Sequence, residues 1–195
     1  MDKLIIKKKE YDFVNLLSED EMMKSSIVTR KNKSFLLREC KNEKAYEEAL
    51  YRYKTLYKSG IYVPKLVVND RHSLKMLFEY FSEKNMAEVL SNEEIDDIYF
   101  EGLFLLYKFV RIANIELNYL PENFVYHKKT LYYTSLDLFE RNEKLNLENY
   151  GLEFWFTSKK AFEHLEKLGY KVDKKRIIPQ PEVNKKIVLI SIKHW

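Results

Sequence analysis

The stretch Glu116-Leu117-Asn118-Tyr119-Leu120-Pro121-Glu122-Asn123 decides the fold assignment, because a proline-fixed polar turn is followed here by two short β-rich runs. The runs Phe124–Tyr126 and Thr130–Tyr133 flank the polar residues His127–Lys129. This pattern predicts a β-hairpin directly after the turn. With only four glycines and four prolines in the chain, each such residue is a strong positional signal.

On the N-terminal side of this turn, the sequence indicates a long apolar helix. Ser91 and Glu94, three residues apart, have the spacing of a capping box and predict the start of the helix. Its apolar face would carry Tyr99, Leu103, Leu106 and Phe109. We therefore expect residues 82–195 to form a mainly helical part that contains the turn and the hairpin.

The first 81 residues have a different character. Residues 27–39 read as strand, polar turn, strand, and residues 43–58 show the apolar spacing of a helix that ends before Gly60. Two more β-rich runs follow at residues 61–68 and 74–81. Residues 1–81 are thus predicted to form an antiparallel sheet carrying one helix, and the fold class is α+β.

At the C-terminal end we expect one helix and one strand. The helix covers residues 158–168 and is ended by Gly169, and the strand covers residues 187–192 after two prolines. That run is apolar on both faces, so either this chain or a partner must cover it. A homodimer paired through this strand is one arrangement that the pattern allows.

Composition narrows the class of protein. A chain of 195 residues can bury roughly 70% of its unfolded surface in one domain or in two unequal lobes. It lacks an apolar run of the ~18 residues that a bilayer span needs, and its start lacks the features of a secretory signal, which indicates a cytoplasmic protein. The single cysteine, Cys40, and four scattered histidines argue against disulfides and structural zinc. The net charge of +4 does not by itself indicate nucleic-acid binding.

The order of these elements resembles the protein-kinase-like superfamily. Residues 116–123 are similar to the family's catalytic loop H-R-D-L-x-P-E-N, with Asn118 at the place of the catalytic aspartate. Asn123 matches the metal-binding asparagine of the loop. The phrase Ser59-Gly60-Ile61-Tyr62-Val63-Pro64 is typical of compact bacterial and archaeal members, such as lipopolysaccharide-core kinases and Rio-like proteins. The resemblance covers about residues 25 to 140.

The resemblance also implies a nucleotide site. Arg38 takes the place of the lysine that holds the phosphates of ATP, and either Glu47 or Glu48 takes the place of its glutamate partner. Glu79 and Phe81 end the run that looks like the adenine-binding hinge.

Counting from Asn123, Ser135 takes the place of the magnesium-binding aspartate. Asp137, two residues further on, could replace it only if the hairpin had a different register. The implied cofactors are ATP and Mg²⁺, if nucleotide binding is retained.

Several of these positions lack the chemistry of phosphoryl transfer. The amide of Asn118 has no useful basicity, Arg38 has a planar fork instead of a compact ammonium, and the hydroxyl of Ser135 is a poor magnesium ligand. No glycine precedes Gly60, so a glycine-rich phosphate loop is missing. The sequence therefore favours a pseudokinase that binds a protein partner.

Two alternatives remain at this point. The first is an active, divergent kinase for a small molecule, a sugar or lipopolysaccharide, with Asp137 holding the metal and Arg38 the phosphate. If the chain is an enzyme, it would be an ATP-dependent phosphotransferase of this kind. The second is a nucleic-acid-binding or interaction protein that uses the basic segment from Lys171 to Arg176.

Overall fold

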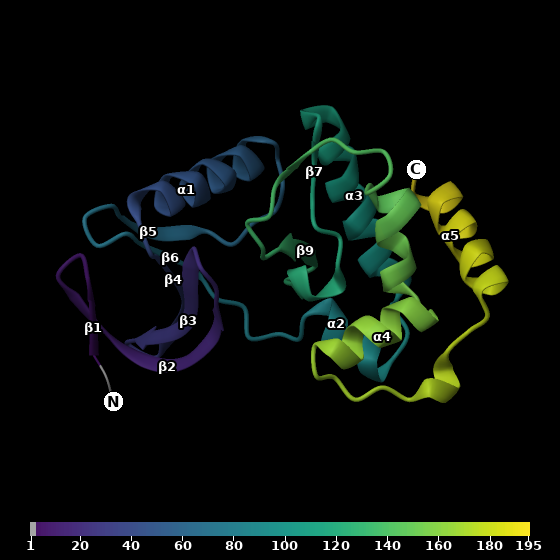
Figure 1. The fold of residues 1–195 in the computed structure, drawn as a ribbon, viewed down its shortest axis with the longest axis horizontal. Coiled ribbons are helices and arrows are strands. Elements are labelled where there is room, and N and C mark those ends of the chain that lie inside the picture. Colours follow the sequence, from purple (N-terminus) through teal and green to yellow (C-terminus); the bar gives the residue numbers. More distant parts are fainter. Residues whose placement is uncertain (1–2) are drawn as a thin grey trace. The chain divides into compact units, whose positions relative to one another are not determined.

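A computed structural model describes residues 3–195, which form an α+β fold with an antiparallel sheet and one helix first and a mainly helical part after them (Figure 1). The chain forms two compact units. The first contains Met1–Thr55 and Val63–Ser82, and the second contains Leu56–Tyr62 and Glu83–Trp195. The last turn of helix α1 (Glu43–Lys58) therefore belongs to the second unit.

The sheet of the first unit has six antiparallel strands in the order β1-β2-β3-β4-β6-β5. The predicted hairpin at residues 27–39, the helix at 43–58 and the two later strands are confirmed, with shorter bounds for the two later strands. Strands β1 and β2 were not predicted. The bounds are β1 Lys3–Ile6, β2 Lys9–Glu19, β3 Met23–Arg30, β4 Lys33–Cys40, β5 Leu66–Asp70 and β6 Lys75–Glu79.

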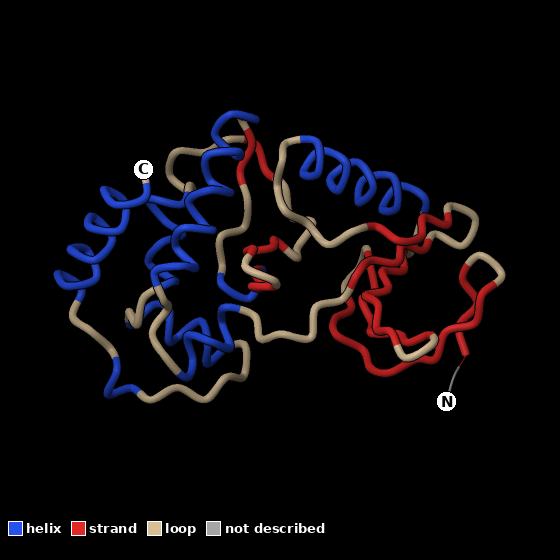
Figure 2. The backbone as a smooth tube through the Cα atoms, turned by 180° about the vertical axis from the view of Figure 1, so that it is seen from behind, coloured by secondary structure: helices blue, strands red, loops and turns tan. Residues whose placement is uncertain are grey.

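The sheet is curled (Figure 2), and one of its faces carries a buried apolar cluster. The backbone N–H of Lys7, in the turn after β1, donates a hydrogen bond of 3.1 Å to Oδ2 of Asp70 at the end of β5. The turn that follows the first strand thus contacts the end of the last strand in the sheet order. The buried cluster on this face consists of Ile6, Tyr11, Val28, Leu37 and Leu77.

Helix α1 supplies the other half of the first unit's core, with buried Tyr46, Leu50 and Tyr53. The ring of Tyr53 meets that of Phe78 edge-on, with the centroids 5.4 Å apart, so α1 packs on the face of β6 that carries Phe78. Gly60 follows the helix with a φ of 81°, and the N–H of the next residue, Ile61, bonds to the Leu56 carbonyl at 3.1 Å. The predicted glycine stop is confirmed, because this left-handed conformation carries almost no steric cost for glycine.

The second unit packs helices around a small hairpin. Its main buried side chains on α3 include Phe100, Phe104 and Tyr107, and Trp155 is fully buried near them. The predicted hairpin is confirmed as β8 and β9. The bounds are α2 Met86–Asn92, α3 Asp97–Ala113, β7 Ile115–Glu116, β8 Phe124–His127, β9 Thr130–Tyr133, β10 Phe139–Glu140, α4 Lys159–Lys167 and α5 Gln180–His194, with short helical turns at Pro121–Asn123, Leu147–Gly151, Leu152–Trp155 and Lys174–Arg176.

The predicted helix start at Ser91 is wrong. Ser91 lies inside α2, where its hydroxyl donates to the Glu88 carbonyl at 2.8 Å instead of capping a new helix. Asn85 caps α2 by accepting from the Glu88 N–H at 2.8 Å, and α3 begins only after Asp96. By contrast, the helix predicted for residues 158–168 is confirmed, since Ser158 caps α4 by accepting from the Ala161 N–H at 3.0 Å.

The predicted terminal strand is also wrong, because residues 187–192 belong to helix α5. The buried side of α5 packs against the rest of the second unit. Val183 is fully buried, and the ring of His194 stacks on Phe104 with the centroids 5.8 Å apart. Residues 187–192 therefore offer no strand through which a homodimer could pair. Between residues 3 and 195, no helix is both long and apolar enough to cross a membrane.

Candidate functional site

The turn at residues 116–123 brings three polar residues of the second unit together. The side-chain amide of Asn118 donates a hydrogen bond of 3.1 Å from Nδ2 to Oδ2 of Asp137. Its own Oδ1 accepts from the Leu120 N–H at 3.3 Å, and Nδ2 of Asn123 donates to the Asn118 carbonyl at 3.2 Å. Asn118, Asn123 and Asp137 thus form one hydrogen-bonded group.

The hairpin between them has the register that the residue count predicts. Phe124 pairs with Tyr133 and His127 with Thr130, which leaves a two-residue turn. The N–H of Thr134 then donates to the Asn123 carbonyl at 2.8 Å, so Ser135 follows directly beside Asn123.

Asp137 reaches the turn without any change in this register. The N–H of Asp137 donates to Oγ of Ser135 at 3.1 Å, and this bend returns the carboxylate to Asn118. The expectation that only a different register could bring Asp137 to the site is therefore wrong. The carboxylate of Asp137 therefore belongs to this group.

Tyr133 ties the two segments together and was not predicted as a site residue. Its hydroxyl donates to the Asp137 carbonyl at 2.9 Å and accepts from the Asn118 N–H at 3.3 Å. Nε1 of buried Trp155 likewise donates to the Tyr119 carbonyl at 2.7 Å. In the sequence both residues look like ordinary core aromatics, because spacing alone does not indicate which hydroxyl or N–H faces a backbone group.

A buried, hydrogen-bonded pair of side chains lies within the turn. Glu116, at the place of the histidine in the family's H-R-D motif, is 2% exposed and accepts a short hydrogen bond from the hydroxyl of Tyr119. Burial raises the pKa of the Glu116 carboxyl, and the hydrogen bond from Tyr119 opposes this only in part. Burial also raises the pKa of Tyr119 far above its usual range. Glu116 thus favours its neutral form more than an exposed glutamate does.

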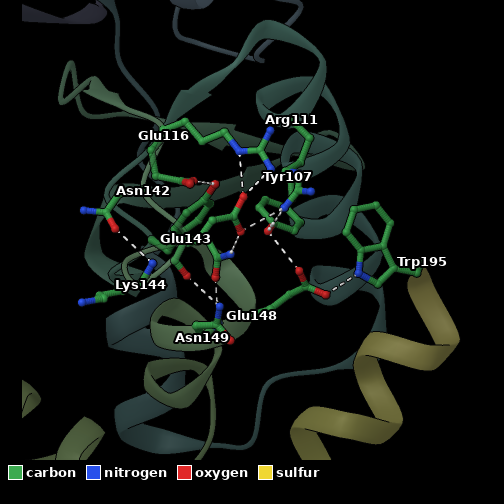
Figure 3. Close-up of polar contacts among 12 residues, drawn as sticks. Tyr107, Arg111, Glu116, Asn142, Glu143, Lys144, Glu148, Asn149 and Trp195 are labelled. Atoms are coloured by element: carbon green, nitrogen blue, oxygen red, sulfur yellow. Dashed lines mark hydrogen bonds and ion pairs between the residues drawn. The ribbon is translucent and has the colours of Figure 1, made fainter.

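A second polar group lies next to this pair and joins α3 to the chain's last residues (Figure 3). The hydroxyl of Tyr107 donates to Oε2 of Glu148 at 3.1 Å and accepts from Nη1 of Arg111 at 3.3 Å. Nε1 of Trp195 donates to Oε1 of Glu148 at 2.5 Å, and its ring lies 5.5 Å from that of Tyr107. These contacts are satisfied within the unit, which is the pattern of a structural network.

The predicted phosphate-binding arginine lies in the first unit. Arg38 on β4 is 7% exposed, and its guanidinium lies over the ring of Phe78 at 5.3 Å from the centroid. The two candidate glutamates on α1 form ion pairs with other arginines: Glu48 with Arg52 at 2.5 Å and Glu47 with Arg71 at 3.0 Å. A pair between Arg38 and either glutamate stays a prediction.

The two hinge candidates lie at the end of β6 and just after it. Glu79 is the last residue of β6, and its N–H donates to the Lys65 carbonyl at 2.9 Å. Phe81 is 7% exposed. Their predicted contact with adenine stays a prediction.

The turn that leads into β3 is acidic, which the sequence reasoning missed. Arg38 on β4 lies opposite Ser25 of β3 in the sheet. Glu19, Asp20 and Glu21 lie just before β3 in the chain. Oδ1 of Asp20 accepts from the N–H groups of the two following methionines at 2.7 and 2.8 Å, which fixes the turn without a glycine. Glu21 is exposed at this turn, and its negative charge would repel a polyphosphate placed nearby.

The side chains around Asn123 include few ligands for a magnesium ion. In the described part of the chain, no three side chains of His, Cys, Asp or Glu gather as a metal site. The group here offers one carboxylate, on Asp137, besides the amide of Asn123 and the hydroxyl of Ser135. Magnesium prefers carboxylate and phosphate oxygens, and the carboxylate is already hydrogen-bonded to Asn118.

The basic segment from Lys171 to Arg176 is partly used within the second unit. Arg176 donates to the carbonyls of Ser91 and Leu90 at 2.9 and 3.1 Å, and Lys174 pairs with Glu166 at 2.9 Å. Two of its charges thus anchor the loop after α4. This leaves less positive charge for a nucleic-acid backbone than the sequence indicates.

Comparison with known proteins defines the class of fold. No protein-family model and no curated protein sequence matches the chain. Among solved structures, the BubR1 kinase domain matches with a TM-score of 0.51 at 9% identity, over 71% of this chain and 50% of that chain. The autoinhibited serine kinase domain of the giant muscle protein titin matches with a TM-score of 0.54 at 15% identity, over 68% of this chain and 46% of that chain.

The fold is therefore protein-kinase-like. The chain spans about half the length of these two kinase domains. At such low identity the likeness concerns the fold alone, so any activity must be argued from this chain's own residues.

Proposed function

We propose that this protein is a kinase-like binding module that transfers no phosphoryl group. One observation carries the proposal: at the place of the catalytic carboxylate stands the amide of Asn118, which donates its hydrogen bond to Asp137. A catalytic base must accept a proton from the substrate hydroxyl. An amide oxygen has no useful basicity, and Oδ1 of Asn118 already accepts from the Leu120 N–H at 3.3 Å.

The remaining phosphoryl-transfer functions are weakened as well. Catalysis of this reaction depends on placing the nucleotide, neutralising its charge and orienting the nucleophile. The hydrogen bond between Asp137 and Asn118 and the exposed charge of Glu21 in the turn before β3 work against the first two functions. What remains is a folded scaffold, and a protein partner is the simplest ligand for it.

Nucleotide binding tests this proposal directly. In thermal-shift measurements with ATP and Mg²⁺, we expect no magnesium-dependent rise in the melting temperature. Asn123→Ala tests the residue that matches the metal-binding asparagine, and Asn184→Ala, an exposed change on α5, serves as the matched control. A magnesium-dependent rise accompanied by turnover of ATP, both lost in Asn123→Ala but kept in Asn184→Ala, would overturn the proposal.

The divergent-kinase alternative has one specific observation in its favour, namely that Asp137 lies at the turn. In that alternative Asp137 would take the metal-holding role, and its carboxylate would have to release the Asn118 amide. Asp137→Ala should then remove any turnover of ATP. If neither ATP nor an acceptor is consumed by the unmodified protein, this alternative fails.

A further inference from the structure

Strand β2 (Lys9–Glu19) is longer than the strand that covers its outer edge. β1 pairs with β2 only from Lys9 to Asp12. From Phe13 to Glu19, β2 pairs with β3 on one side, and no strand of residues 3–195 covers the other side. An uncovered strand edge has backbone N–H and C=O groups ready to pair with another chain.

The side chains of this segment are unusual for an open edge. From Val14 to Glu19 every residue is exposed, so neither face of the strand is buried there. Three of them are apolar: Val14 is 52% exposed, Leu16 48% and Leu17 49%. The pairing of β2 with β3 shifts register twice in this segment, which re-aims neighbouring side chains. Proteins usually protect an open edge with charged side chains, whereas this one is apolar along its middle.

The charge at the end of the edge indicates what kind of chain would bind. The edge runs into Glu19, Asp20 and Glu21. Glu19 pairs with Lys41 at 2.9 Å, whereas exposed Glu21 forms no ion pair within the described residues. The open segment from Phe13 to Glu19 contains no lysine or arginine, so a second copy of β2 pairing through it would bring no positive charge to Glu21. The charges therefore favour a basic partner over self-association.

We propose that the outer edge of β2, from Phe13 to Glu19, binds an extended peptide that adds a strand to the sheet. Alternate apolar residues of the peptide would cover the exposed apolar side chains on one face of β2, and its backbone would pair with the open edge. In antiparallel register the peptide's N-terminal end lies beside Glu21, so basic residues belong at that end. This inference names the class of partner that the protein binds. It rests on the proposed function only in assuming that the protein is a binding module.

The test uses the full chain and a labelled seven-residue peptide with two arginines followed by alternating valine and threonine. We expect saturable binding in fluorescence anisotropy. Glu21→Lys should weaken binding about tenfold, while Glu101→Lys, an exposed charge reversal on α3, should leave it within about twofold. A peptide that is N-methylated at alternate residues keeps its side chains and charge but cannot pair fully, and we expect it not to bind.

Several results would overturn the inference. These are no binding at millimolar peptide, equal binding of the N-methylated peptide, equal weakening by both charge reversals, or a β2-dependent dimer in sedimentation that excludes the peptide. None of them bears on Asn118 or on nucleotide binding. The failure of this inference is therefore distinguishable from the failure of the proposed function.

Discussion

At the scale of single residues, Asn118 explains most about the site. Its amide acts as the donor to Asp137, a role that an aspartate at the same place could not fill while ionised. The geometry of the turn at residues 116–123 is therefore compatible with an amide at this position and unfavourable for two charged carboxylates in contact.

Asn118→Asp should accordingly lower stability in a pH-dependent way. Two facing carboxylates raise a folded-state pKa above its unfolded value, so the penalty is present at neutral pH and disappears as the pH falls through that raised pKa. We expect a melting temperature several degrees below that of the unmodified protein at pH 7 and nearly equal to it near pH 4. Asn118→Ala removes the hydrogen bond without adding charge and is the control. A deficit of equal size at both pH values would contradict this explanation.

Glu116 provides a second pH-dependent prediction. Burial raises the folded-state pKa of the Glu116 carboxyl above its unfolded-state value. The free energy of unfolding of the unmodified protein therefore falls as the pH rises through the raised pKa and Glu116 ionises. Glu116→Gln keeps an acceptor for the Tyr119 hydroxyl and cannot ionise. Urea unfolding should show similar free energies of unfolding near pH 4 and a more stable variant at pH 8. A variant that is less stable at pH 8 than the unmodified protein would contradict the burial argument.

At the scale of elements, three hairpin turns use non-glycine residues in left-handed conformations. Lys7 and Lys8, Lys31 and Asn32, and Lys128 and Lys129 all have positive φ. Two-residue turns of this kind favour Asn-Gly, because a side chain in this conformation costs roughly 1 kcal/mol per residue. These turns form because the flanking strands pair, not because of their own preference, which is why the first hairpin gave no recognisable signal in the sequence.

Replacing the β8–β9 turn tests this directly. The double change Lys128→Asn and Lys129→Gly should raise the free energy of unfolding by about 1 kcal/mol. The same two residue types at Lys185 and Lys186, inside helix α5, should lower it, because asparagine and glycine are poor helix formers. Urea unfolding of both double variants measures the difference. A stabilised helix variant or a destabilised turn variant would contradict the argument.

At the scale of the whole molecule, local patterns in the sequence predicted most of the fold. The order strand, strand, helix, strand, strand, the hairpin after Asn123 and the helix ended by Gly169 all follow from apolar spacing and turn residues. The terminal helix was missed because Ile187 to Ile192 is rich in β-branched residues, whose strand preference is overridden by packing on α3.

The candidate site was predictable only in part. The spacing of Asn118 and Asn123 follows from the sequence, and the structure joins them through the Asn118 carbonyl. The approach of Asp137 depends on the bend at Ser135 and on the hydroxyl of Tyr133, which bonds to both segments. Such tertiary hydrogen bonds have no periodicity that a sequence could display.

The central claim concerns phosphoryl transfer, so the most direct test is the formation of ADP from ATP by the full chain in the presence of Mg²⁺. With Asn118 in place of a base, the rate should equal that of Asn123→Ala and of buffer alone. Turnover that is clear in the unmodified protein, kept in Asn184→Ala and abolished in Asn123→Ala would contradict the claim.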